Sequence, residues 1–155
     1  MNTRNRKVMV VLLLAGCSLL SYSLWISIRQ VKIIAVHQRS SNFSDVLVEN
    51  FPVTDKGKIA WWLENKKILK NKYKLPNSGS EGSFYITFWL FGDGYKKESK
   101  YDRLCFTDMK TENNCIDKNA VFSVEDGREG SVIFTLYNGT YRMEKNGKII
   151  KVQRQ

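Results

Sequence analysis

Residues 8–28 read VMVVLLLAGCSLLSYSLWISI, a run of 21 residues without a charged side chain. Basic residues precede it within RNRK at 4–7, and Arg29 follows it. A helix of that length measures about 31 Å, which matches the hydrocarbon core of a bilayer at about 30 Å. The run therefore predicts a transmembrane helix over 8–28, a short segment 1–7 before it, and one domain, 29–155, after it.

The same run contains Leu14-Ala15-Gly16-Cys17, which has the small-residue spacing of a bacterial lipoprotein cleavage box. A processed lipoprotein would carry lipid on Cys17 and continue into a polar tether. Here residues 18–28 stay apolar, and Tyr22 and Trp25 lie toward the far end, where interfacial aromatic residues occur. A cleaved signal has a short apolar region that ends in polar sequence. We therefore favour an uncleaved anchor, with lipidation of Cys17 as the alternative.

The charges that flank the run favour a cytoplasmic N-terminus only slightly, because basic residues lie on both sides of it. They are Arg4, Arg6 and Lys7 before the run and Arg29, Lys32 and Arg39 after it.

The cysteines give an independent argument about location. Cys105 and Cys115 are the two cysteines that follow the run, and nine residues separate them. In an oxidising compartment such a pair favours a disulfide that adds about 2–3 kcal/mol of stability, whereas two unpaired buried thiols are the alternative. Both arguments predict a domain outside the cytoplasm, in the periplasm of a Gram-negative bacterium, on a single-pass inner-membrane anchor.

The domain is basic. The 22 Lys and Arg and the 15 Asp and Glu that follow residue 28 leave it a net charge of +7. In the cytosol that balance would favour nucleic acid. Outside the cytoplasm we expect no nucleic acid, and the available partners are the membrane itself, an acidic protein, or an anionic envelope component such as a lipid head group or cell-wall polymer.

Hydrophobic periodicity predicts the elements of the domain. Residues 54–73 have helical spacing, with Thr54 or Asp55 as the N-cap. Residues 83–91 (SFYITFWLF) give the strongest strand signal, and because both faces are apolar we expect a central strand covered by the helix. Further strands are predicted at 31–36, 45–50, 101–106, 120–124, 131–137, 140–143 and 149–152, with loops at 77–82 and 107–114 and hairpin turns at Asn138-Gly139 and Asn146-Gly147. The pattern is typical of a small α+β domain in which one amphipathic helix packs on a mostly antiparallel sheet.

The predicted helix has one apolar and one basic side. Its apolar side comprises Ile59, Trp62, Leu63, Leu69 and Tyr73, widened by Trp61 and Ile68. Its polar side carries five lysines within nine residues: Lys66, Lys67, Lys70, Lys72 and Lys74. They are a candidate interaction face for anionic lipid or an acidic partner. The alternative is a solvated helix face whose lysine stems cover apolar surface.

Ten short stretches, spread over nearly the whole chain, form a recognisable set: LAGC at 14–17, VKI at 31–33, AVH at 35–37, NFP at 50–52, TDKGKI at 54–59, WWLENK at 61–66, FGDGY at 91–95, YDRLCF at 101–106, NCIDKN at 114–119 and NGTY at 138–141. Together they resemble a family of small enterobacterial single-span membrane proteins of unknown function. The resemblance implies an inner-membrane protein with one N-terminal span and an uncharacterised domain. It supplies no catalytic or binding residues.

Candidate catalytic groups are few. His37 is the only histidine, so a Ser-His-Asp or Cys-His arrangement would have to use it, although a satisfied or solvent-facing histidine is the simpler interpretation. No HExxH, CxxC, EF-hand or Walker spacing occurs, so we expect no metal and no other cofactor. Glu125 with Asp126, or Asp102 with Asp108, could serve a small membrane-tethered hydrolase if the fold brought them together. We expect instead a module that binds an envelope partner without catalysis.

Overall fold

The computed structural model describes residues 3–77 and 82–152. The loop expected at 77–82 therefore lies mostly outside the described residues. The chain divides into two units, residues 1–30 and 31–155, which are considered separately.

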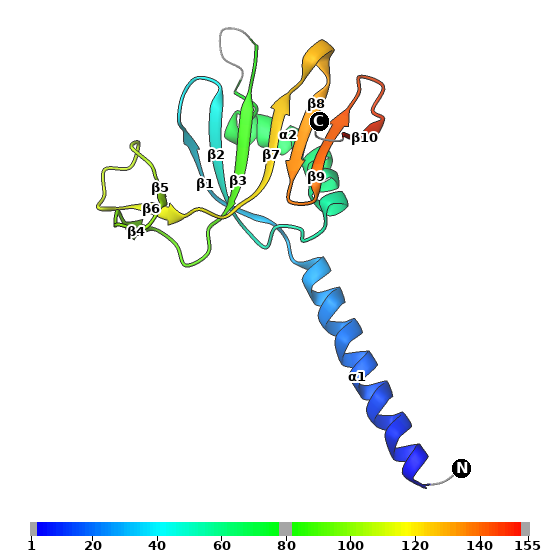
Figure 1. Cartoon of the computed structure of the whole chain (residues 1–155). Coiled ribbons are helices and arrows are strands. Elements are labelled where there is room, and N and C mark those ends of the chain that lie inside the picture. The colour runs from blue at the N-terminus through cyan, green and yellow to red at the C-terminus, as the bar shows by residue number, and fades with distance from the viewer. Residues whose placement is uncertain (1–2, 78–81, 153–155) are drawn as a thin grey trace. The chain divides into compact units, whose positions relative to one another are not determined.

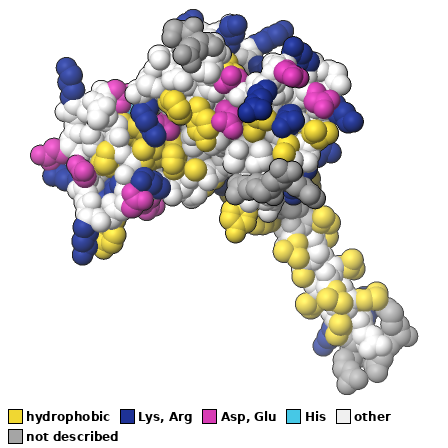
Figure 2. Space-filling view, turned by 45° about the horizontal axis from the view of Figure 1, so that its top comes forward, with side chains coloured by type: hydrophobic (Ala, Val, Ile, Leu, Met, Phe, Trp, Pro, Cys, Tyr) yellow, Lys and Arg dark blue, Asp and Glu magenta, His cyan; other side chains and the backbone are white. Residues whose placement is uncertain are grey.

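The first unit contains helix α1, Thr3–Ile28 (Figure 1). Its described side chains are exposed, and Figure 2 shows hydrophobic side chains along it. Asn5–Trp25 has a mean hydropathy of 2.0, and of the described helices α1 is the one long and apolar enough to cross a membrane. The length and composition of α1 are those of the expected anchor.

The second unit is built on a seven-stranded sheet in the order β1-β2-β3-β7-β8-β9-β10 (Figure 1). Neighbouring strands are antiparallel except β2 and β3, which are parallel. The mostly antiparallel α+β fold is thus confirmed. The parallel pairing of β2 with β3 was not predicted from the sequence. The strands are β1 (Lys32–Gln38), β2 (Phe43–Glu49), β3 (Tyr85–Leu90), β7 (Ala120–Asp126), β8 (Val132–Leu136), β9 (Gly139–Met143) and β10 (Ile149–Val152), and a short 3-10 helix, η1 (Arg128–Gly130), joins β7 to β8.

A parallel pair needs a crossover, and helix α2, Asp55–Tyr73, provides it between β2 and β3. Its N-cap is Thr54, whose Oγ1 accepts a hydrogen bond from the Gly57 N–H at 3.1 Å. At the other end Lys74 has a left-handed backbone (φ 58°), and the Lys74 N–H donates to the Lys70 carbonyl at 3.2 Å. The expected helix and its cap are confirmed.

One face of the sheet packs against α2 and forms the main core. Phe88 is central to it, because its ring centroid lies 5.3 Å from that of Phe51, 6.1 Å from that of Trp62 and 5.5 Å from that of Phe122. The central position expected for the strand that carries Phe88 is therefore confirmed. Ile68 does not widen the buried side of α2 as expected, since its side chain is 55% exposed. The other buried members are Val46, Val48, Ile59, Leu69, Leu75, Ile86, Val124, Phe134 and Leu136.

A smaller sheet forms a second core with the opposite side of the main sheet. Its strands, in the order β4-β6-β5, are Lys96–Lys97, Asn113–Asp117 and Arg103–Cys105. Phe106 and Ile116 from this segment are buried with Leu47 of β2, and Trp89 of β3 packs against them. Strand β5 is therefore shorter than the strand expected over 101–106, and it lies in the small sheet and not in the seven-stranded one.

The strand directions define two ends of the domain. We call the end at which β1 begins the tether end, because the chain enters the domain there. Lys32 pairs with Glu49 at this end, and the β8–β9 turn, which follows Leu136, also lies there. At the distal end lie the beginnings of β2 and β3 and the β7–β8 connection. Helix α2 runs from the tether end to the distal end, where Asn77 Nδ2 lies 3.5 Å from Oε1 of Gln38, the last residue of β1.

Candidate functional site

The five candidate lysines extend from the second half of α2 to its C-cap, toward the distal end. We call Lys66, Lys67, Lys70, Lys72 and Lys74 the lysine surface. All five side chains are exposed, and in the described parts of the chain none forms an ion pair. Lys74 Nζ donates to the Asn71 carbonyl at 3.1 Å, and Lys72 Nζ lies 5.2 Å from the Tyr73 ring centroid. The lysine surface therefore presents unneutralised positive charge to solvent.

Several other charged groups of the domain pair with one another. Asp117 accepts from Lys96 and from Arg103 Nε, and these hydrogen bonds hold the pKa of Asp117 below its ordinary value. In the space-filling view both signs of charge are interspersed over the visible face (Figure 2). Further pairs between acidic and basic side chains join Lys32 to Glu49, Arg39 to Asp45, Lys96 to Asp93, Lys97 to Glu112 and Lys118 to Asp102.

His37 lies between the two sheets and is buried, with 6% of its surface exposed. Its Nδ1 lies 2.8 Å from Asp108 Oδ2, and its Nε2 lies 2.9 Å from the Tyr95 hydroxyl. A neutral imidazole satisfies both contacts, since Nδ1–H can donate to the carboxylate while Nε2 accepts from the phenol. The Phe106 ring stacks on the imidazole at 3.9 Å. The histidine is a satisfied one, as the simpler interpretation expected.

The arrangement of Asp108, His37 and Tyr95 has the order of a relay, but its tyrosine is poorly suited to attack. Burial, and then the charge of Asp108, raise the pKa of Tyr95 above 10.0. A phenol with a raised pKa is held in its neutral form and is a weak nucleophile. We interpret the three side chains as a clamp that holds the small sheet on β1. Asp108 and Asp102 have different partners, so the contacts do not support them as a catalytic pair.

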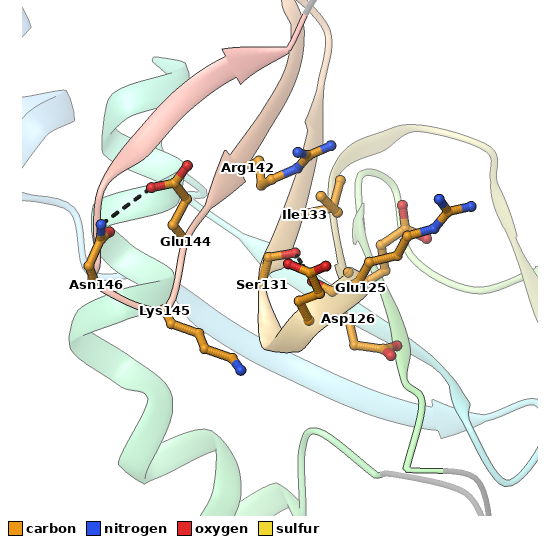
Figure 3. A pocket seen from close by; sticks show the side chains of 11 residues that line it. Glu125, Asp126, Ser131, Ile133, Arg142, Glu144, Lys145 and Asn146 are labelled. Atoms are coloured by element: carbon orange, nitrogen blue, oxygen red, sulfur yellow. Dashed lines mark hydrogen bonds between the residues drawn. The ribbon is translucent and has the colours of Figure 1, made fainter.

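A pocket of about 850 Å³ lies at the distal end, between the β7–β8 and β9–β10 connections (Figure 3). Glu125, Ile133 and Arg142 occupy one row across β7, β8 and β9. Its lining is completed by Asp126, Gly127, Arg128, Glu129, Ser131, Glu144, Lys145 and Asn146. Cations and anions are mixed around the pocket, which distinguishes it from the uniformly basic lysine surface.

The pocket contains one of the carboxylate pairs considered for a hydrolase. Glu125 and Asp126 are consecutive strand residues, so their side chains start toward opposite faces of the sheet. Asp126 Oδ1 accepts the Phe84 N–H at 2.8 Å, which gives that carboxylate a structural role. Burial, and then the charge of Asp126, raise the pKa of Glu125 above 4.5. These contacts do not favour two carboxylates acting together on one substrate.

The raised pKa of Glu125 predicts a pH-dependent contribution to stability. A carboxyl group whose pKa is higher in the folded than in the unfolded state stabilises the fold fully below the unfolded value, and that stabilisation is lost as the pH rises through the folded value. We expect Glu125→Gln to raise the urea midpoint at pH 7 and to change it little below about pH 4.5. Urea unfolding across this range checks the prediction, and parallel pH profiles for the variant and the parent would contradict it.

The three cysteines lie in two environments. The sulfur atoms of Cys105 and Cys115 lie 2.13 Å apart, at disulfide distance, and join β5 to β6. Cys17 is exposed on α1. Among the described residues no group of three or more His, Cys, Asp or Glu side chains could hold a metal ion.

The sequence analysis named Asp108 only as a possible partner of Asp102 and did not single out Tyr95, so both contacts of His37 were missed. Tyr95 lies 58 residues from His37 and Asp108 lies 71 residues away, so no local spacing connects them. The one available signal was that a lone histidine in a β-branched strand would need polar partners when buried.

Comparison with known proteins places the whole chain in a family. Residues 2–153 match the family described as "Enterobacterial putative membrane protein (DUF943)", whose function is uncharacterised. No curated protein matches the chain, and no solved structure does. Because the match covers nearly the entire sequence, the chain belongs to this family of enterobacterial membrane proteins.

Proposed function

We propose that this protein is a single-span inner-membrane protein whose periplasmic domain binds an anionic envelope partner through the lysine surface, without itself catalysing a reaction. Residues 1–7 are then cytoplasmic, 8–28 span the membrane and 29–155 form the periplasmic domain. The family assignment and the apolar helix α1 support the membrane location. The disulfide distance between Cys105 and Cys115 supports an oxidising compartment.

The observation that carries the proposal is the concentration of unpaired lysines on the lysine surface. Elsewhere in the domain acidic side chains pair with Lys32, Lys96, Lys97 and Lys118. Lys100, Lys110, Lys145 and Lys148 also have no ion pair among the described residues, but they are spread over three separate segments. Five exposed like charges repel one another, and a surface that bears them gains free energy when an anionic partner replaces that repulsion with attraction. The attraction acts over about 8 Å at physiological ionic strength, so partner binding weakens as salt is added.

The lysine surface lies away from the end of the domain at which β1 begins, and we propose an acidic protein or wall polymer as its partner. From Asp55 to Lys70 the helix extends about 22 Å away from the tether end. Cys17 belongs to the apolar stretch of α1, and in this proposal it is a small apolar residue of an uncleaved anchor.

The proposal is tested by reversing the charge of the lysine surface. We expect the variant in which Lys66, Lys67, Lys70, Lys72 and Lys74 all become Glu to lose the partner that crosslinks to the native protein in intact envelopes, because attraction becomes repulsion. The matched control changes five exposed lysines elsewhere to Glu, which gives the same net charge: Lys97, Lys100, Lys110, Lys145 and Lys148.

The readout is mass spectrometry of what co-purifies after crosslinking, with thermal unfolding to show that both variants fold. Loss of the partner in the first variant and its retention in the control support the proposal. Equal retention in both variants, or equal loss from both, contradicts a specific role for the lysine surface. A parallel assay with phosphatidylglycerol vesicles distinguishes a lipid partner from a protein or polymer.

A further inference from the structure

Two large apolar side chains stand out at the tether end of the domain. Val53 is 77% exposed and Tyr137 is 97% exposed, the highest values for large hydrophobic residues in the described part of the domain. Val53 precedes α2, and Tyr137 occupies the turn between β8 and β9. Single exposed apolar residues are common on protein surfaces, so their meaning depends on their position.

The two turns that carry these side chains are held together. Asp55, at the start of α2, lies with Oδ1 3.4 Å from Asn138 Nδ2 and with Oδ2 3.2 Å from the Tyr141 hydroxyl. The β8–β9 turn lies beside the beginning of α2 in Figure 1. Val53 and Tyr137 therefore belong to one exposed edge of the domain, fixed by contacts that use neither side chain.

A short segment of chain joins this end of the domain to α1. Helix α1 ends at Ile28 and β1 begins at Lys32. Four residue steps span at most about 15 Å, so the beginning of β1 stays within that distance of the end of α1. β1 begins at the same end of the sheet as the two turns, so this is the end of the domain from which the chain leads to the anchor.

The charges of this edge suit a phospholipid surface. Lys56 is exposed beside Asp55. Lys151 lies close to Gly139, the first residue of β9, because its Nζ would be 3.6 Å from a Cβ atom added there. The acidic groups nearby are engaged, since Glu49 lies 3.7 Å from Lys32 Nζ and Asp55 accepts hydrogen bonds. Two cations flanking an aromatic and an aliphatic side chain match the chemistry of the headgroup region, where tyrosine and lysine are favoured.

We propose that Val53 and Tyr137 enter the headgroup region of the bilayer that holds α1, with Lys56 and Lys151 on lipid phosphates. The tether end then docks on the membrane, and the distal end, with the lysine surface and the pocket, faces away from it. This docking is a second interaction of the domain and does not depend on what the lysine surface binds.

The two Asn-Gly turns of β9 provide a matched pair of positions for the test. Asn138 and Asn146 are both exposed, and they lie at opposite ends of the strand. Full-length protein with Cys17→Ser would carry Asn138→Cys or Asn146→Cys, each labelled with the fluorophore NBD. The first variant loses the Asn138–Asp55 contact but keeps the contact of Asp55 with the Tyr141 hydroxyl, which still joins the two turns. Both would be reconstituted in vesicles of phosphatidylethanolamine and phosphatidylglycerol that contain a nitroxide-labelled lipid.

We expect the nitroxide to quench the probe at position 138 several-fold more than the probe at 146. Adding Val53→Asp and Tyr137→Asp should remove that difference, because two carboxylates are expelled from the headgroup region. Equal quenching at both positions, stronger quenching at 146, or a difference that survives the two aspartates would overturn the docking. Since the lysine surface is unchanged throughout, this result is independent of the envelope-partner experiment.

Discussion

Replacing Phe88 by alanine is expected to lower the free energy of unfolding by about 3–5 kcal/mol, because it removes a fully buried ring from the main core. The Phe88 ring centroid lies 5.7 Å from that of Trp61, edge-on, and the Phe51 ring stacks on it. The aromatic contacts add to the loss, since each such pair is worth about 0.5–1.5 kcal/mol beyond its buried area. A loss of this size approaches the total stability of a small domain.

The measurement is urea unfolding of the full-length protein in detergent, followed by near-ultraviolet circular dichroism of the core aromatics. Tyr137→Ala is the matched control, because that ring is 97% exposed and its loss should change the free energy of unfolding by less than about 0.5 kcal/mol. If Phe88→Ala were as mild as Tyr137→Ala, the packing of β3 against α2 would be incorrect.

Removing the Cys105–Cys115 link is expected to cost about 2–3 kcal/mol, the chain-entropy value for a short closed loop. The link closes the loop that carries Phe106 and Asp108, which cover and bind His37. Without the disulfide the unfolded chain has more conformational entropy, and β5 and β6 are no longer covalently joined. Cys105→Ser with Cys115→Ser should therefore unfold at a lower urea concentration than the parent.

The His37 clamp provides the control for this variant. If the disulfide and the clamp support the same segment, the two sites are coupled and their effects are not additive. The loss in free energy of unfolding caused by His37→Ala should then differ between the double serine variant and the parent. Strict additivity, or an unchanged urea midpoint after cysteine replacement, would contradict a shared role.

Local pattern predicted the elements that local chemistry determines. The run over 8–28 became α1, and Thr54 with the periodic residues after it specified α2 and its cap. The Asn138-Gly139 and Asn146-Gly147 pairs placed the last two hairpins of the main sheet, because these pairs favour tight turns between antiparallel strands.

The sequence did not predict which distant strands pair with one another or in which direction. β2 and β3 are both apolar, and such strands pair equally well in parallel or antiparallel fashion until the crossover helix fixes their direction. The separation of β5 from the main sheet depends on contacts of Phe106 and Ile116 with Leu47, a residue more than fifty positions away. The same distance in sequence concealed the Asp108–His37–Tyr95 clamp.

The lysine surface illustrates the limit for function. Its residues were visible in the sequence, and the structure adds that they are exposed, unpaired within the described residues and distant from the end where the chain enters. A run of charges in a sequence is usually only a solvated face. These three properties are the reason for proposing that this one binds a partner.

The proposed function requires the domain to lie on the periplasmic side of the membrane. Alkylation of intact envelopes without reductant, followed by peptide mapping by mass spectrometry, measures the thiol state of Cys105 and Cys115 in the native protein. We predict that both are protected as one disulfide-linked peptide pair and that neither is alkylated before reduction. Free, alkylated thiols at both positions would contradict a periplasmic domain and, with it, the envelope partner.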